Sequence, residues 1–155
     1  MVSQLVANWK VELMLAIGII GTRSRNTFED RLDVYEAIAD LLTNKLGYRE
    51  AWPDYAIVSG GCPQGGDNFA ERWGFPVHKL IPEASTDLKT GHCNVHPALW
   101  DQYGRSAGYR RNTYIARDAD WLIACVANNR KGGTEDTIKK FLAKGPEFKE
   151  RLILV

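Results

Sequence analysis

Residues 55–74, YAIVSGGCPQGGDNFAERWG, decide the fold class of this chain. Residues 55–58 are apolar and predict a short buried strand, whereas residues 67–73 predict the start of a helix. The turn between them contains four glycines, Gly60, Gly61, Gly65 and Gly66. Glycine accepts positive φ, and a glycine-rich turn between a strand and a helix brings free backbone N–H groups to an anion. We therefore predict a phosphate-binding turn, with Asp67 as the N-cap of the helix.

The same alternation of strand and helix continues on both sides of this segment. Apolar runs predict strands at residues 13–20, 55–58, 75–81, 121–127 and 152–155. Apolar residues at helical spacing predict helices that begin near residues 26, 67, 107 and 135. Strands that alternate with helices form a parallel sheet covered on both faces. We predict an α/β protein with one three-layer Rossmann-like domain over residues 1–155, whose mostly parallel sheet has about five strands.

Two segments lie outside this plan. Residues 1–10 form an N-terminal extension, either an edge element or an interface arm. Residues 82–106 contain prolines and glycines and show no clear period, so we expect a long loop over the site, since such loops usually serve a ligand. Two aromatic residues of this loop, Trp100 and Tyr103, either stack on a base or cover the edge of the sheet.

Composition limits the classes of partner. The 155 residues carry a formal net charge of +1, which argues against a nucleic acid or an anionic membrane as partner. The three cysteines are odd in number and irregularly spaced, which indicates a reducing compartment rather than a disulfide framework. The longest apolar run near the start is too short to span a bilayer, and no cleavable leader precedes it. We expect a cytoplasmic protein with no membrane partner.

Three glycine-containing turns follow predicted strands, at residues 21–23, 59–67 and 132–134. Ligands of open parallel sheets bind beyond the carboxyl ends of the strands, so these turns should meet, together with residues 105–112. Arginine forks beside backbone N–H groups favour phosphate, and we predict a site for a nucleotide-type small molecule. The predicted ligand-binding residues are Gly21, Thr22, Arg23, Ser59, Gly60, Gly61, Gly65, Gly66, Asp67, Arg105, Gly108, Arg111, Asn112, Gly132, Gly133 and Thr134.

Four motifs together resemble the SLOG superfamily: GTR at 21–23, SGGCPQGGD at 59–67, AGYRRN at 107–112 and GGTED at 132–136. This Rossmann-like group includes the LOG-type phosphoribohydrolases, the DNA-binding protein DprA and the YspA/YpsA-related branch of bacteria and phages, to which the pattern is most similar. The resemblance implies a Rossmann-like fold, a nucleotide or nucleotide-derived ligand, and a homodimer.

Three functions stay open at this point. The first is a sensor or ligand-sequestering module that binds a nucleotide without chemistry. The second, implied by the LOG-type relatives, is an N-glycosidase that releases a free base, with Glu135, Asp136 and Arg111 as catalytic candidates. The LOG motif reads PGGxGTxxE, and Thr137 stands here in the place of its glutamate. The third function is DNA binding as in DprA, which the neutral net charge disfavours.

Two further features are interpreted as structural. His92, Cys93 and His96 form an HCxxH cluster, but their spacing fits no standard zinc module, and we expect neither a metal nor a cofactor. Cys62 in the glycine-rich turn precedes a helix N-terminus, where a thiolate is favoured. The sequence places no general base beside it, so we do not expect a nucleophile.

Overall fold

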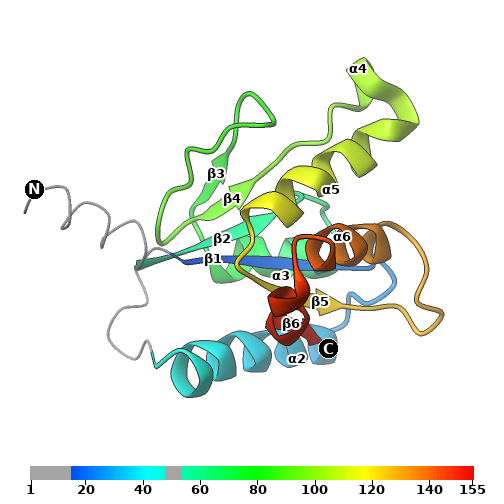
Figure 1. Ribbon diagram of the computed structural model, residues 1–155. Helices are drawn as coiled ribbons and strands as arrows, with labels where there is room; N and C mark the ends of the chain where they lie inside the picture. Colours follow the sequence, from blue (N-terminus) through cyan, green and yellow to red (C-terminus); the bar gives the residue numbers. More distant parts are fainter. Residues whose placement is uncertain (1–14, 48–53) are drawn as a thin grey trace, which may run out of the picture.

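The computed structural model describes residues 15–47 and 54–155, which form a parallel sheet between two layers of helices (Figure 1). The six strands are β1 (Leu15–Gly21), β2 (Tyr55–Ser59), β3 (Val77–Lys79), β4 (Cys93–Val95), β5 (Trp121–Cys125) and β6 (Leu152–Leu154). Their order across the sheet is β3-β4-β2-β1-β5-β6, and every neighbouring pair is parallel. The predicted α/β fold class is confirmed.

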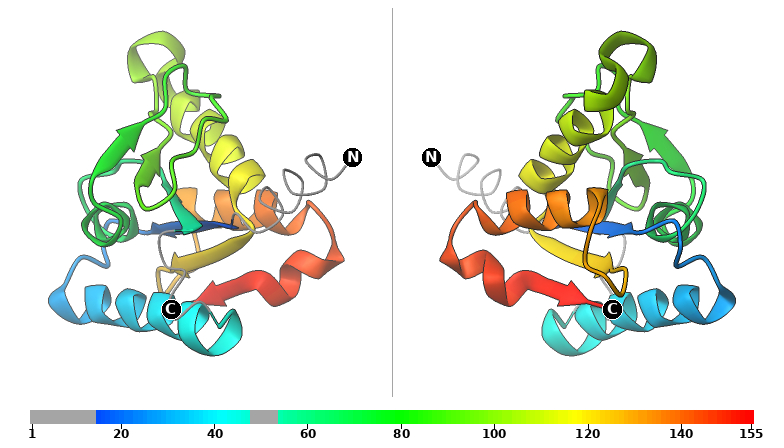
Figure 2. Two further views of the ribbon diagram at one scale, coloured as in Figure 1. Left: turned by 90° about the vertical axis from the view of Figure 1, so that its left-hand side faces the viewer. Right: turned by 90° about the vertical axis from the view of Figure 1, so that its right-hand side faces the viewer.

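The two helical layers are held by two separate apolar clusters. The helices are α2 (Phe28–Asp40, extended by the π-helical turn Leu41–Lys45), α3 (Gly66–Trp73), α4 (Trp100–Tyr103), α5 (Ala107–Asp118) and α6 (Gly133–Leu142), with 3₁₀ turns at Gly104–Ser106 and Pro146–Arg151. One face of the sheet packs against α2 and α3 through Ile17, Ile19, Val34, Ile38 and Phe69. The other face packs against α5 and α6 through Ile20, Val58, Ile115, Leu122 and Phe141. Figure 2 shows α2 on one side of the sheet and α5 with α6 on the other.

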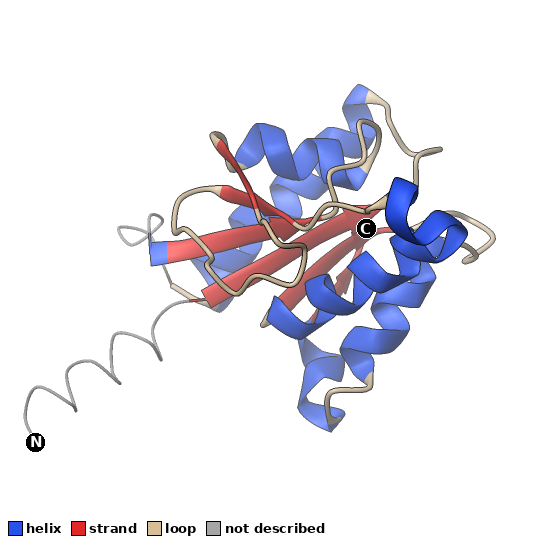
Figure 3. Cartoon of the chain, turned by 90° about the horizontal axis from the view of Figure 1, so that it is seen from above, coloured by secondary structure: helices blue, strands red, loops and turns tan. Residues whose placement is uncertain are grey.

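Strand β4 lies inside the segment that the sequence predicts to be a loop. It pairs with β2 through Ile57 and Cys93, and with the edge strand β3 through Val77 and Cys93. Its three residues are all buried, and Asn94 donates from Nδ2 to the carbonyl of Ile57 at 3.0 Å. A strand this short has too few residues to show a period, and a buried asparagine at its centre hides the apolar signal. The sheet therefore has six strands instead of about five (Figure 3).

The helices α2 and α3 begin in different ways, because a side chain caps the N-terminus of α2 and no side chain caps that of α3. Thr27 caps α2 in a capping box, because its hydroxyl accepts from Asp30 N and the Asp30 carboxylate accepts from Thr27 N. The N-cap of α3 is Gly65 at φ +76°, so the interpretation of Asp67 as the N-cap is wrong. Asp67 lies inside the first turn of α3, and its carboxylate instead accepts from Cys62 N at 3.1 Å in the preceding turn.

The predicted N-terminal extension, residues 1–10, lies outside the described residues. None of the helices in residues 15–47 and 54–155 is both long and apolar enough to cross a membrane.

Candidate functional site

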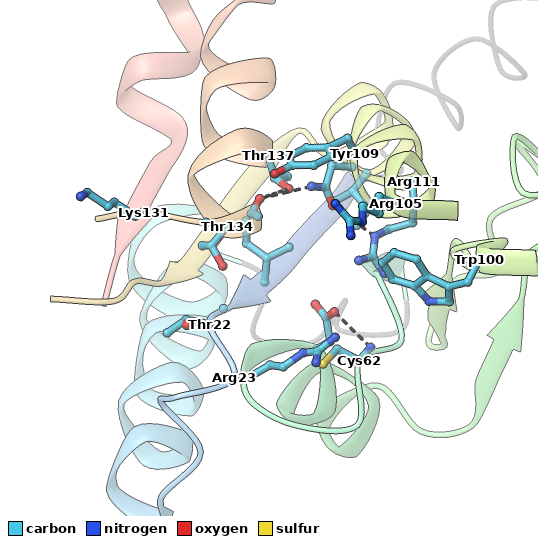
Figure 4. A pocket seen from close by; sticks show the side chains of 18 residues that line it. Thr22, Arg23, Cys62, Trp100, Arg105, Tyr109, Arg111, Lys131, Thr134 and Thr137 are labelled. Atoms are coloured by element: carbon cyan, nitrogen blue, oxygen red, sulfur yellow. Dashed lines mark hydrogen bonds between the residues drawn. The ribbon is translucent and has the colours of Figure 1, made fainter. Parts of the chain in front are cut away.

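A pocket of about 380 Å³ opens at the carboxyl ends of β1, β2 and β5. The sheet extends from β1 to β2 in one direction and to β5 in the other, which makes this edge the point where strand order reverses. The pocket walls contain eleven of the predicted ligand-binding residues: Gly21, Thr22, Arg23, Asp67, Arg105, Gly108, Arg111, Asn112, Gly132, Gly133 and Thr134. The turns after three separate strands and the start of α5 thus surround one cavity (Figure 4).

Five predicted residues do not line this pocket: Ser59, Gly60, Gly61, Gly65 and Gly66. Ser59 is fully buried, and Gly60 and Gly61 line a neighbouring pocket. Gly66 is required by packing, since a Cβ there would overlap the Ile20 carbonyl group and Gly21 N. This close approach lets the first turn of α3 lie directly against the end of β1.

A chain of hydrogen bonds from α5 joins the turns on either side of the pocket. Arg111 donates from Nη1 to the carbonyl of Gly60 and from Nε to Asn112 Oδ1 at 3.1 Å. Asn112 in turn donates from Nδ2 to the carbonyl of Gly133 and to Asp136 Oδ2, both at 3.2 Å. The turn after β2 and the first residue of α6 are therefore held to one helix through two side chains.

Positive charge dominates the pocket walls. The cationic lining residues are Arg23, Arg105, Arg111 and Lys131, whereas Asp67 is the acidic residue among them. In the part of the chain that the structure describes, none of these four cations forms an ion pair with a carboxylate. In Figure 4 the ammonium group of Lys131 points away from the other three cations. An anion that enters the pocket thus meets Arg23 and Arg105 without a carboxylate partner, whereas Arg111 already donates to Gly60 and Asn112 and its charge acts on Asp67.

The carboxyl group of Asp67 is only 7% exposed. Burial raises its pKa, and the charge of Arg111 and the Cys62 N–H act in the opposite direction without cancelling the effect. Because its pKa is raised, Asp67 becomes neutral at a higher pH than an exposed aspartate, and a neutral carboxyl group does not repel a bound phosphate. Protonation of Asp67 therefore removes a repulsion between this side chain and an anion in the pocket.

Two exposed aromatic rings border the pocket, Trp100 at 52% and Tyr109 at 55% exposure. Exposed rings beside cationic groups offer faces on which a base can stack. Sequence reasoning missed Tyr109 as a site residue, together with Ile20, Ile115, Lys131 and Thr137. The sequence could have indicated Ile115, because it lies at helical spacing from Gly108, Arg111 and Asn112 and therefore on the same face of α5.

The predicted catalytic carboxylates lie beside the pocket and are absent from its walls. Glu135 pairs with Arg130 through both guanidinium nitrogens Nε and Nη2. Asp136 accepts from Asn112 and pairs with Lys140 Nζ at 2.9 Å. Arg111 is the one catalytic candidate that lines the cavity. Both carboxylates therefore have structural partners that hold α6 in place.

The HCxxH residues do not come together as ligands. His96 is fully buried, with Nδ1 2.5 Å from the carbonyl of Glu83 and Nε2 2.5 Å from Asp118 Oδ2. Both ring nitrogens thus face protein oxygen atoms within hydrogen-bond distance and are not free to bind a metal. Within the described residues, no group of three or more His, Cys, Asp or Glu side chains is arranged to hold a metal ion.

Comparisons with known proteins give one sequence relative and one structural neighbour to report. No family model matches the chain. It is 25% identical over 127 residues to the Gene 61 protein of Mycobacterium phage D29, a match that covers 82% of this chain and 88% of the phage protein. Its fold is similar to that of DNA processing protein A (DprA) from Helicobacter pylori, a structure that describes a single-stranded DNA binding mode. That match has a TM-score of 0.56 at 18% identity and covers 94% of this chain and 67% of the other.

The structural similarity establishes a DprA-like, Rossmann-like fold, and it corrects one prediction. The argument from net charge against a nucleic acid partner is wrong, because a protein of this fold binds single-stranded DNA. The physical reason is that a ligand responds to the local potential of the surface it contacts rather than to the net charge. Here a protein of net charge +1 collects four cations around one cavity.

Proposed function

We propose that the pocket at the carboxyl ends of β1, β2 and β5 binds nucleotide units of single-stranded DNA. The observation that carries this proposal is the set of arginines in the pocket walls, Arg23, Arg105 and Arg111, beside the exposed rings of Trp100 and Tyr109. Proteins that bind single strands combine a positive groove for the backbone with aromatic faces for the bases. The DprA-like fold and the SLOG-like motifs support the same proposal. From the motifs alone we infer that the chain belongs to the YspA/YpsA-related branch.

Each part of the pocket has a role in this proposal. Arg23 offers its guanidinium fork to a phosphate, because such forks match phosphate oxygens in two-pronged geometry. Arg111 adds its positive charge and the N–H donors that Gly60 and Asn112 leave free. The start of α6 adds backbone N–H groups, since the first N–H groups of a helix have no partner within it. Trp100 and Tyr109 stand at the mouth, where unpaired bases stack on them. A duplex keeps its base faces covered and is bound more weakly.

A free nucleotide is the second candidate, favoured by the size of the cavity. Its volume of about 380 Å³ falls within the range of small-molecule pockets, roughly 300–1,000 Å³. The phosphate and base contacts would be the same, and the protein would then act as a sensor or would sequester the nucleotide.

Fluorescence anisotropy with labelled oligo(dT) tests the proposal, with the matching duplex and dTMP as competitors. We expect binding at about 50 mM salt that weakens as salt rises, because bound phosphates release counterions. Replacing Arg23 with Gln should lower the slope of log K against log salt by about 0.7, the value for one phosphate contact on a single strand. Absence of strand binding at low salt refutes the proposal. Binding of dTMP without binding of the strand supports the second candidate instead.

A further inference from the structure

A second pocket adjoins the first and is of nearly equal size, about 370 Å³ against about 380 Å³. Four residues line both pockets: Arg23, Cys62, Trp100 and Arg111. In Figure 4, Arg23 and Cys62 lie on one side of the first cavity, and Arg111 and Trp100 lie on another. The two pockets are therefore neighbouring compartments that share a wall of two arginines, one indole ring and one thiol.

The second pocket has walls of its own that differ in character from those of the first. Val77, Val95, Pro97 and Ala98 give it an apolar lining from the ends of β3 and β4. Lys79 adds one cation that does not line the first pocket. Besides the shared Arg23 and Arg111, the carboxyl group of Glu71 also lines this pocket. Apolar walls with an acceptor among them suit a sugar and a base better than an isolated phosphate.

We propose that the ligand occupies both pockets as two nucleoside units joined through phosphate, with the joining phosphate between Arg23 and Arg111. This inference rests on the proposed function, which places one nucleotide in the first pocket. The shared arginines fit the joining group, because the fork of Arg23 and the remaining N–H donors of Arg111 border both compartments. The equal volumes give the second nucleoside as much room as the first. Trp100 borders both compartments and offers its ring to the base in either one.

Calorimetric titration with three short ligands tests this inference. The ligands are pdT with one nucleoside, pdTp with one nucleoside and a second phosphate, and pdTpdT with two nucleosides. We expect pdTpdT to bind at least about tenfold more tightly than pdTp, since stacking of one further base contributes about 1–3 kcal/mol. The comparison with pdTp removes the effect of the added phosphate. Equal affinities for pdTp and pdTpdT overturn the inference.

Two substitutions locate the second unit. Ala98→Phe fills the second pocket, and Thr134→Phe, the matched control, narrows the first pocket alone. We expect A98F to reduce the affinity for pdTpdT to that for pdTp while pdT binding changes less than about twofold. T134F should weaken all three ligands. A98F that leaves pdTpdT affinity unchanged overturns the inference, and circular dichroism of both variants checks that they fold.

The outcomes also separate this inference from the proposed function. If none of the three ligands and no longer oligo(dT) binds, the proposed function fails and the inference fails with it. If pdT binds and the second nucleoside adds nothing, only the inference fails. NAD tests a free dinucleotide as the ligand, because its two nucleosides are joined through a pyrophosphate. NAD that binds as tightly as pdTpdT supports the two-compartment site and identifies free dinucleotides as ligands alongside strands.

Discussion

Arginines of α5 and of the turn before it have two opposite roles. Arg105 and Arg111 line the pocket and form no ion pair within the described residues. Arg110 pairs with the buried carboxylate of Glu83, and Arg117 pairs with Asp118 at 2.8 Å. Arg110 fastens the segment before β4 to the helix through Glu83, and Arg117 does so by donating to the carbonyls of Ala84 and Ser85. Arg105 and Arg111 instead present positive charge to the pocket. The number of arginines on a helix is thus a poor guide to binding, and their carboxylate partners decide the role.

The ion pairs of α5 should control the stability of the fold. Asp118 is buried with His96, and although burial raises its pKa, hydrogen bonds from His96 and Arg117 lower it overall. We expect Asp118→Ala to reduce the free energy of unfolding by about 3 kcal/mol at neutral pH, because it leaves Nε2 of the buried His96 without its partner. The lowered pKa means that this stabilisation is complete above the pKa of an unfolded aspartate, about 3.9, and is lost as pH falls through the folded value.

Urea denaturation across pH measures this effect. The exposed Asp101→Ala on α4 is the control and should change stability by less than about 0.5 kcal/mol. A D118A protein as stable as wild type at neutral pH would show that the buried pair does not fasten the segment to α5.

The arginines that line the pocket should control the affinity for oligo(dT). We expect Arg111→Gln to weaken oligo(dT) binding by about 2 kcal/mol, roughly thirtyfold, because it removes a charged hydrogen-bonding fork from the pocket. Arg117→Gln removes the same charge from the same helix and should change affinity less than about twofold. Anisotropy titrations of both variants at one salt concentration make the comparison. Equal losses in the two variants would mean that net charge rather than the pocket sets the affinity.

Stacking should contribute less than the arginine fork. We expect Trp100→Ala to weaken oligo(dT) binding by about 1–2 kcal/mol, and Trp100→Phe to restore most of it, since a smaller ring still stacks. Tyr103→Ala on the same short helix is the control, because the Tyr103 ring lies against Arg110 with 4.1 Å between its centroid and Cζ. Quenching of tryptophan fluorescence on binding gives an independent reading. An alanine variant that binds as tightly as wild type excludes Trp100 from the ligand contacts.

The smallest effect should come from the one acid in the pocket. Burial raises the pKa of Asp67, so this carboxyl group becomes neutral at a higher pH than an exposed aspartate. Oligo(dT) affinity should therefore rise as pH falls through that pKa, by about 1 kcal/mol, because the repulsion between carboxylate and phosphate disappears. In Asp67→Asn the affinity should not vary with pH over the same range. A pH dependence that survives in D67N must come from another group.

The sequence predicted the central part of the fold well and its edge poorly. Apolar runs and glycine-rich turns identified β1, β2 and β5 with the turns that follow them, because these strands are buried on both faces. The segment between β3 and α5 was not predictable in the same way. Its one strand is three residues long with Asn94 at the centre, and its buried side chains Glu83 and His96 meet their partners Arg110 and Asp118 on α5 only in three dimensions.

The site residues follow the same division. The turn residues that line the pocket were predictable from the sequence, because a glycine next to an arginine or threonine is a local signal. Tyr109 and Lys131 were not, since exposure and proximity to a cavity depend on where α5 and the turn after β5 lie. Gly66 was assigned to the ligand, although what it fits is the backbone of β1. A glycine motif therefore indicates a close approach to the backbone. It does not tell whether a ligand or another part of the protein makes that approach.

The position of β1 in the sheet has a consequence for how the chain is made. Ile17 pairs with Ile57 on one side and with Trp121 on the other, 104 residues later in the sequence. The emerging polypeptide can join β1 to β2 early, but the other flank of β1 stays open until β5 has been synthesised. Contacts of such long sequence separation form slowly, so the half-finished sheet exposes an apolar edge in the meantime. During translation this edge is where chaperones or wrongly paired strands would attach, and the pocket exists only once that flank has closed.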